Sequence, residues 1–144
     1  MNRRRVRSRE RGAVSVELAL LAPALLLLLS FAIWAGRTQI ARNAVQEAAR
    51  AAARDASLAA DAATAQADAI EQARQTLARQ DLRCQDLAVG VDTAGFRVPV
   101  GVSDDVTVTV RCTVAMSDLL APGLPGAVAV TASFASPVDA FRER

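Results

Sequence analysis

The sequence predicts a membrane-anchored α+β protein with one long N-terminal helix, a possible second helix and a small antiparallel sheet of about three strands. Two observations lead to this fold class. Residues 18–36 form an apolar segment without a single charge, and residues after Gln80 alternate between apolar and polar side chains with a period of two. A chain of 144 residues has room for one membrane segment and one small domain.

The first twelve residues are strongly basic. Six arginines and Glu10 give them a formal charge of +5, whereas the rest of the chain carries −3. They lack apolar periodicity, so we expect this leader, residues 1–12, to be disordered and to stay in the cytoplasm by the positive-inside rule. A nucleic-acid-binding arm is the alternative. Arginines that abut an apolar segment are better explained by orientation and anionic lipid, so no nucleic-acid partner is expected.

The apolar segment begins at Leu18 and ends at Gly36. As a helix it measures about 28 Å, close to the ~30 Å hydrocarbon thickness of a bilayer. We therefore predict a transmembrane helix over residues 13–37, with Trp34 at the headgroup level and the Arg37 charge reaching outward. A cleaved signal peptide is the alternative. An uncleaved anchor is favoured because the apolar run is long and no small-residue cleavage site follows it.

Residues 38–80 are predicted to form an Ala-rich helical region outside the cytoplasm. Small and apolar residues recur there at helical spacing, so the membrane helix is expected to continue as a rod. Ser57 and Asp61 are each able to restart a helix as an N-cap, which leaves open a second helix over about 61–80. The alanine stripe has two interpretations, close packing against neighbouring subunits or simply high helix propensity. The second helix would bury Ala62, Ala65, Ala69, Ile70, Ala73 and Leu77.

Residues 81–144 are predicted to form the small sheet domain. Clear alternation occurs over residues 106–115 and 128–135, and residues 87–91 give a weaker third strand. Turn residues separate these runs. A three-stranded sheet needs a helix on its apolar face, and the helix that ends near Gln80 is the available partner.

Cys84 and Cys112 are the only cysteines. Outside the cytoplasm they would form a disulfide that stabilises the domain by about 3 to 4 kcal/mol in the chain-entropy model. A reactive thiol or a metal-binding pair is the alternative. The chain has no histidine and no C-x-x-C spacing, which favours the structural disulfide.

No sequence motif indicates catalysis. The chain lacks histidine, a glycine-rich phosphate loop and a G-x-S-x-G elbow, so we expect neither enzymatic activity, cofactor or metal, nor a small-molecule substrate. Asp104 and Asp105 invite a calcium or acid/base hypothesis. Adjacent residues on a turn usually point apart, so a solvated turn is favoured.

Glu17 is the residue that most needs a functional explanation. A carboxylate at the edge of an apolar span is costly unless it is paired. Cleavage after Gly12 would remove the basic leader, free an α-amine on Ala13, and place Glu17 one helical turn from that amine. An ammonium group of the same or a neighbouring subunit would then neutralise the carboxylate and fix the axial register between subunits.

The run Arg-Gly-Ala-Val-Ser-Val-Glu over residues 11–17, followed by a Leu/Ala-rich span with an early proline at Pro23, resembles the TadE-like family. These are minor pilins or pseudopilins of tight-adherence (Tad/Flp) pili, which are similar to type IV pili. The resemblance implies that Gly12 is the cleavage residue of a prepilin peptidase, Ala13 the new N-terminus and Glu17 the assembly carboxylate. Major pilins of these systems often have Tyr where this chain has Leu18, which favours a minor pilin.

The resemblance also implies the partners and the location of the chain. Its partners would be the membrane, the prepilin peptidase, other pilins or pseudopilins, and the Tad assembly platform. It would cross the inner membrane once, with its N-terminus in the cytoplasm and its C-terminus outside, and would reach the pilus after processing. The alternative is an uncleaved, signal-anchored accessory binding protein of the envelope or of secretion, in which Glu17 pairs with Arg11 of its own leader.

Overall fold

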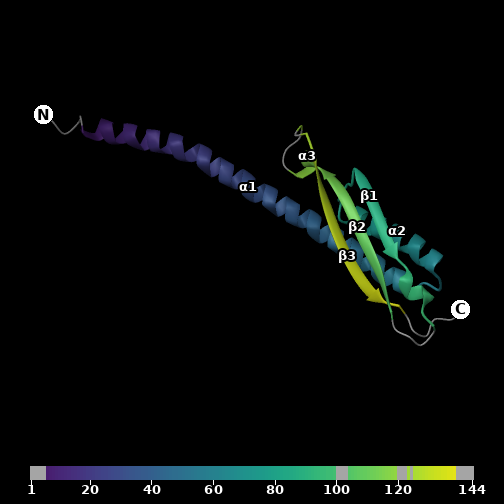
Figure 1. Cartoon of the computed structure of the whole chain (residues 1–144). Helices are drawn as coiled ribbons and strands as arrows, with labels where there is room; N and C mark the ends of the chain where they lie inside the picture. The colour runs from purple at the N-terminus through teal and green to yellow at the C-terminus, as the bar shows by residue number, and fades with distance from the viewer. Residues whose placement is uncertain (1–5, 100–103, 120–122, 124, 139–144) are drawn as a thin grey trace. The chain divides into compact units, whose positions relative to one another are not determined.

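The computed structural model describes residues 6–99, 104–119, 123 and 125–138, with the side chains of the first helix described from residue 18 onward. The chain divides into two compact units, residues 1–36 and residues 37–144. The elements confirm the predicted fold class (Figure 1). In chain order they are α1 (Val6–Ser57), α2 (Ala62–Arg79), β1 (Asp86–Asp92), the 3-10 turn η1 (Ala94–Arg97), β2 (Asp105–Ala115), α3 (Met116–Leu119) and β3 (Ala127–Pro137).

The long helix begins earlier than the sequence suggested. α1 begins at Val6, inside the basic leader, so the prediction of disorder was wrong for residues 6–12. Arginine is a good helix former, and extending an existing helix requires no new nucleation. The leader residues before Val6 lie outside the described part of the chain.

A capped break separates the two helices. α1 ends at Ser57, and Asp61 is the N-cap of α2. One carboxylate oxygen of Asp61 accepts hydrogen bonds from the backbone N–H of Ala63 (2.9 Å) and Thr64 (3.0 Å), and the other accepts the Thr64 hydroxyl (2.9 Å). These bonds satisfy backbone donors that a helix start leaves unpaired. The possible second helix is therefore present, with Asp61 as its cap.

The three strands form one antiparallel sheet in the order β1-β2-β3. The odd-numbered side chains of β2 alternate with a fully buried set on the opposite face, as the period of two predicts. Figure 1 places the second half of α1 together with α2 on one side of the sheet. The buried face of β2 consists of Val106, Val108, Val110, Cys112 and Val114, each at most 1% exposed.

Both helices supply the cover that the sheet needs. The prediction named only the helix that ends near Gln80, but α1 contributes more buried side chains than α2 does. Contacts at two positions join α1 to β3: the Arg50 guanidinium lies 5.2 Å from the Phe134 ring centroid, and the Ser136 hydroxyl donates to the Ser57 hydroxyl (3.2 Å). The sheet domain therefore folds around the extension of the apolar helix.

The alanine stripe of α1 is part of this core. Its members are at most 2% exposed, and they are Ala41, Ala44, Val45, Ala48, Ala49, Ala52, Ala53 and Ala56. α2 presents a matching set, Ala65, Ala69, Ala73, Thr76 and Leu77, while Ala62 and Ile70 are only half-buried. Small side chains let helices and sheet approach closely, which explains the composition. The stripe is thus occupied within its own subunit, and the interpretation that it packs against neighbouring subunits was wrong.

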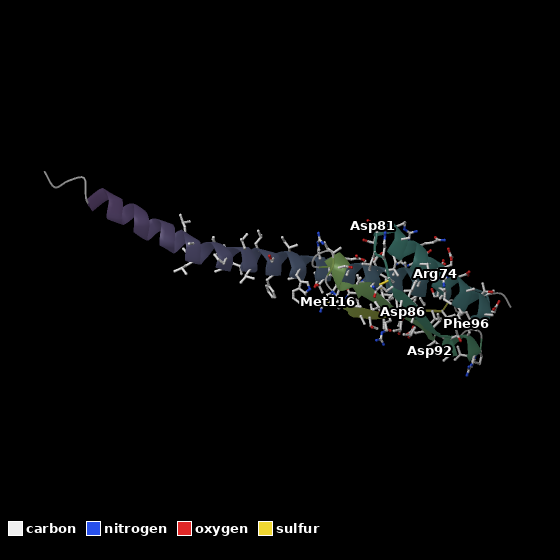
Figure 2. The ribbon with its side chains drawn as sticks, turned by 90° about the horizontal axis from the view of Figure 1, so that it is seen from above. Arg74, Asp81, Asp86, Asp92, Phe96 and Met116 are labelled. Atoms are coloured by element: carbon white, nitrogen blue, oxygen red, sulfur yellow. A yellow bond between two sulfur atoms is a disulfide. The ribbon has the colours of Figure 1, made fainter. Side chains whose placement is uncertain are left out.

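The two cysteines form the predicted disulfide. Cys84 precedes β1 and Cys112 lies in β2, with their Cα atoms 5.3 Å apart, and the bond is drawn in yellow in Figure 2. Next to it, the Gln85 N–H donates to the Thr113 carbonyl (2.7 Å), which begins the β1–β2 pairing. The described chain therefore holds no reactive thiol pair.

Candidate functional site

The segment from Leu18 to Gly36 stands out because its large apolar side chains are exposed. Every large aliphatic residue from Leu18 to Ile33 is between 49% and 74% exposed, and Figure 2 shows side chains that project above and below this part of the helix. An apolar helical surface of this extent is not stable in water and indicates a lipid or protein environment. Among the described helices, one is long and apolar enough to cross a membrane, and this segment is its apolar part.

The far end of the segment carries a pair of aromatic rings. Phe31 and Trp34 have ring centroids 5.6 Å apart in a tilted arrangement. An aromatic pair in this part of the span suits the boundary between hydrocarbon and headgroups, where indole rings concentrate. The boundary between the two compact units falls directly after it, between Gly36 and Arg37.

The helix continues through Pro23 without interruption. Proline has no N–H to donate to the carbonyl four residues earlier, so one backbone acceptor in this turn loses its usual partner. Directly before the aromatic pair, the Ser30 hydroxyl donates to the Leu26 carbonyl (2.8 Å) and so satisfies its own polar group within the helix. Both features are compatible with an apolar environment around the segment.

The residues that the sequence marked for cleavage and assembly lie at the start of this segment. Gly12, Ala13 and Glu17 are within the backbone of α1, but their side chains are outside the described part. The helical backbone nevertheless fixes their spacing. Residues three and four positions apart share a helix face, and the four such positions around Glu17 hold Ala13, Val14, Leu20 and Leu21. None of these four positions holds a cationic residue.

This spacing also bears on Arg11. It lies six residues before Glu17 in the same continuous helix, and not at one of these four positions. The pairing of Glu17 with Arg11, which the uncleaved alternative requires, therefore does not have the three- or four-residue spacing of an ordinary helical ion pair. The Ala13 nitrogen, by contrast, is one turn away from Glu17 and becomes a cation only if the chain is cut before it.

The other groups considered for chemistry have structural roles. Asp104 and Asp105 are both exposed, and an Asp104 carboxylate oxygen accepts the Asp105 N–H (2.9 Å) in the turn that starts β2. That arrangement is a solvated turn, as predicted. No group of three or more His, Cys, Asp or Glu side chains in the described residues is placed to hold a metal ion.

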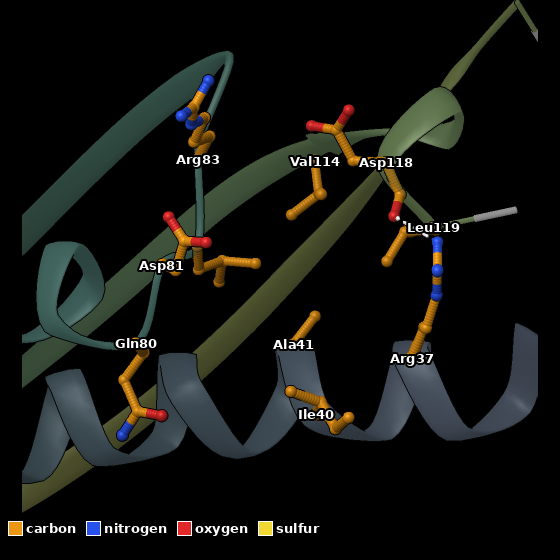
Figure 3. A pocket seen from close by; sticks show the side chains of 10 residues that line it. Arg37, Ile40, Ala41, Gln80, Asp81, Arg83, Val114, Asp118 and Leu119 are labelled. Atoms are coloured by element: carbon orange, nitrogen blue, oxygen red, sulfur yellow. Dashed lines mark hydrogen bonds between the residues drawn. The ribbon is translucent and has the colours of Figure 1, made fainter. Parts of the chain in front are cut away.

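A cavity in the second unit was not anticipated from the sequence. It has a volume of about 460 Å³ and lies between α1, the end of α2 and α3 (Figure 3). Four charged residues line it: Arg37, Asp81, Arg83 and Asp118. They come from three segments far apart in the chain, so periodicity and motif spacing gave no signal that they meet.

The comparisons with known proteins include a match of the candidate segment to a family model. Residues 12–54 match the sequence model of the family described as TadE-like protein. The match confirms the resemblance, and it covers Gly12, Ala13, Glu17 and the whole exposed apolar segment. Comparison with curated proteins and with solved structures gives no significant match.

Proposed function

We propose that this chain is a minor pilin or pseudopilin of a Tad/Flp pilus, made as a precursor and cut after Gly12 by a prepilin peptidase. The observation that supports it is an exposed, uncharged helical segment that starts one residue after Glu17, inside the region matching the TadE-like family. The match to the TadE-like family suggests a Tad pilus-associated protein. In this proposal the segment 18–36 is first the membrane anchor and later the contact with neighbouring pilins.

The electrostatics of the helix start support cleavage as the activating step. In the precursor, Glu17 has no cationic residue three or four positions away in the sequence, and burying an unpaired carboxylate among apolar side chains is costly. Cleavage creates an ammonium group on Ala13, within reach of its own Glu17 or that of the adjacent subunit. A neighbour that offers this ammonium group removes the penalty at only one axial register, so the pair sets how far subunits slide along one another.

The proposed location follows from the charges that flank the segment. The basic leader favours the cytoplasmic side, which puts residues 37–144 outside the inner membrane, where the Cys84–Cys112 disulfide is stable. The partners are then the membrane, the prepilin peptidase, the Tad assembly platform and other pilins. The capped and cross-linked domain would be displayed on, or at the tip of, the fibre.

Intact-mass measurement of the protein from cells with and without an active prepilin peptidase tests the cleavage. We expect a mature form that begins at Ala13 only when the peptidase is active. The Gly12→Val precursor should keep its leader and remain in the membrane. An N-terminus at Met1 or Asn2 in cells with an active peptidase would contradict the proposal.

The assembly role of Glu17 needs a separate measurement. We expect Glu17→Ala to abolish recovery in sheared pili while leaving insertion into the membrane unchanged. Glu47→Ala is the matched control, because Glu47 is an exposed carboxylate on the same helix but outside the apolar segment. Equal recovery of the two variants in pili would argue for the uncleaved accessory protein instead.

A further inference from the structure

The edge of the sheet at β3 lacks the features that usually prevent a sheet edge from pairing. Figure 1 shows β3 as an outer strand, and among the described residues only β2 pairs with it. β3 has 11 residues without a single charge, whereas edge strands are typically short, charged or interrupted by proline. Its one proline, Pro137, is the last residue. An edge of this length and composition is open to an additional strand.

The opposite edge of the same sheet is different. β1 has 7 residues and carries an exposed aspartate at each end, Asp86 and Asp92. Charged residues on an edge strand discourage pairing with a further strand. Of the two edges, β3 is therefore the one without such protection.

The hydrogen-bond ladder indicates which backbone groups of β3 are available. At its two ends the Val138 N–H donates to the Asp104 carbonyl (2.8 Å), and the Met116 N–H donates to the Gly126 carbonyl (2.9 Å). Bonded pairs alternate along an antiparallel ladder, so the even-numbered residues of β3 bond to β2. The odd-numbered residues direct their N–H and C=O groups away from the sheet, and those before the proline are Ala127, Ala129, Thr131, Ser133 and Ala135.

One flank of α1 runs beside this edge. Arg42 and Gln46 line a small cavity together with residues 128–131 of β3, and the Arg50 guanidinium lies 5.2 Å from the Phe134 ring centroid. These three α1 residues follow one another at intervals of four, so they form a row on the helix surface. The cavity measures about 180 Å³, less than the ~300–1,000 Å³ of most small-molecule sites. It suits a side chain of an added strand better than a separate small ligand.

The spacing and charge of this row select the side chains of such a strand. Neighbouring members are about 6 Å apart along the helix, and side chains on one face of a strand are about 6.6 Å apart. Alternate residues of an added strand can therefore meet Arg42, Gln46 and Arg50 in turn. Among the described residues, neither arginine has a carboxylate partner. Acidic residues four positions apart on the added strand would supply both partners.

We propose that the edge of β3 binds an extended, acidic segment of a partner protein by strand addition. The backbone of the partner bonds to the outward N–H and C=O groups of β3, and two of its carboxylates pair with Arg42 and Arg50. A second copy of this chain is a poorer occupant, because pairing β3 with β3 brings two rows of arginines to one junction. The proposal goes beyond the proposed function and uses only residues 37–144, so it does not depend on cleavage.

Titration of a labelled synthetic peptide into the full chain in a nonionic detergent tests the proposal. The peptide is a short capped strand of threonine and valine with two glutamates four positions apart, and fluorescence anisotropy measures its binding. We expect saturable binding. Hydrogen exchange followed by NMR should show new protection at the N–H groups of Ala129, Thr131 and Ser133, and none along β1. Arg42→Gln and Arg50→Gln should each weaken binding about twofold to fivefold.

Methylated peptides separate strand addition from simple charge attraction. Two further peptides carry methyl groups on one or the other alternate set of backbone nitrogens, which removes donors without changing the charge. Only one edge of an added strand faces β3, so one of these peptides should lose binding and the other should keep it.

Variants of the protein give matched controls. Thr131→Pro removes one outward N–H of β3 but none of the bonds to β2, so it should weaken binding while the circular dichroism stays that of wild type. Arg111→Gln changes an exposed arginine of β2 on the opposite face of the sheet and should bind the peptide as wild type does. If Thr131→Pro does not fold, the methylated peptides still decide the question.

Contrary results are equally specific. The proposal is overturned by the absence of saturable binding, by binding that survives both methylations, or by equal binding of a peptide with lysine in place of glutamate. A chain that dimerises in sedimentation, with the dimer lost in Thr131→Pro, would assign the edge to a second copy instead. None of these results affects the intact-mass test of cleavage, so failure of this proposal and failure of the proposed function are distinguishable.

Discussion

At the residue scale, Asp61 caps the start of α2 with a carboxylate that can be titrated. Its pKa is lowered, first by the hydrogen bond from the Thr64 N–H, then by the Thr64 hydroxyl, and also by the Ala63 N–H. Because the folded pKa lies below the ordinary value of 3.8, this carboxylate adds stability above that pH. The contribution is lost as the pH falls through the lower, folded pKa.

We therefore expect Asp61→Asn to have a pH-dependent effect on Tm. Asparagine also caps helices but does not titrate, so wild type should melt at a higher temperature than the variant at neutral pH, and this difference should shrink in acid below the unfolded pKa. Thermal melts of both proteins followed by circular dichroism across this pH range give the measurement. Asp61→Ala, which removes the cap entirely, should lower Tm at neutral pH by more than Asp61→Asn does.

A pH-independent difference between wild type and Asp61→Asn would contradict this account. Asp68→Asn serves as the control, because Asp68 is also on α2 but has no capping bond in the structure. Its difference from wild type should be small at every pH.

Residues differ in how far the sequence predicts their roles. Asp61 precedes a run of helix formers, so its capping role follows from local spacing alone. Asp81 gave no such signal, since its left-handed conformation depends on how α2 ends and on the direction that the chain takes toward β1. Glu17 was identified through its environment in the sequence, an isolated carboxylate before an uncharged run. The charged cavity was missed because Arg37, Arg83 and Asp118 meet only in the folded domain.

At the element scale, the alanines of α1 determine how closely the layers approach. Ala52 is fully buried, whereas Ala67 on α2 is exposed. We expect Ala52→Leu to lower the free energy of unfolding by about 1 to 3 kcal/mol, because added methylenes force side chains and backbone apart in a filled core. Ala67→Leu, a matched change on an exposed helix surface, should stay within about 0.5 kcal/mol of wild type. Urea denaturation of residues 37–144 in the detergent-solubilised chain measures both.

The same pair separates a core role from an intersubunit role. If Ala52→Leu left stability unchanged but prevented recovery in pili, the stripe would be a docking surface after all. The burial of Ala52 instead predicts that Ala52→Leu lowers the stability of the domain, and that any loss of recovery in pili follows from this.

The strands could be predicted from the sequence more fully than the packing of the helices on the sheet. The period of two in β2 reflects one buried and one open face, and in β3 it separates a mostly half-buried face from an exposed one, so the sequence records the orientation of both strands. A stripe of alanines carries no such record, because the same residues suit a helix that contacts its own sheet, a second helix or another subunit. The sequence therefore indicated that a helix covers the sheet, but it did not indicate that α1 and α2 cover it together.

At the scale of the whole molecule, the two units have opposite surface chemistry on one continuous helix. In the first unit α1 exposes leucines, and in the second the same helix buries alanines under a sheet. Composition alone marks the change near Gly36, which is why the end of the apolar segment was predictable. The small side chains of the second unit bury little apolar area per residue, so its stability depends heavily on added constraints.

The Cys84–Cys112 disulfide is one such constraint. It links residues 28 positions apart, and in the chain-entropy model such a loop contributes about 3 to 4 kcal/mol. We expect the double variant Cys84→Ala/Cys112→Ala to lose at least this much in urea denaturation, because Cys112 is also fully buried and its truncation leaves a gap. Wild type unfolded in the presence of a reductant isolates the cross-link itself and should lose the smaller amount. If reduced and oxidised wild type unfolded at the same urea concentration, the domain would owe its stability to packing alone.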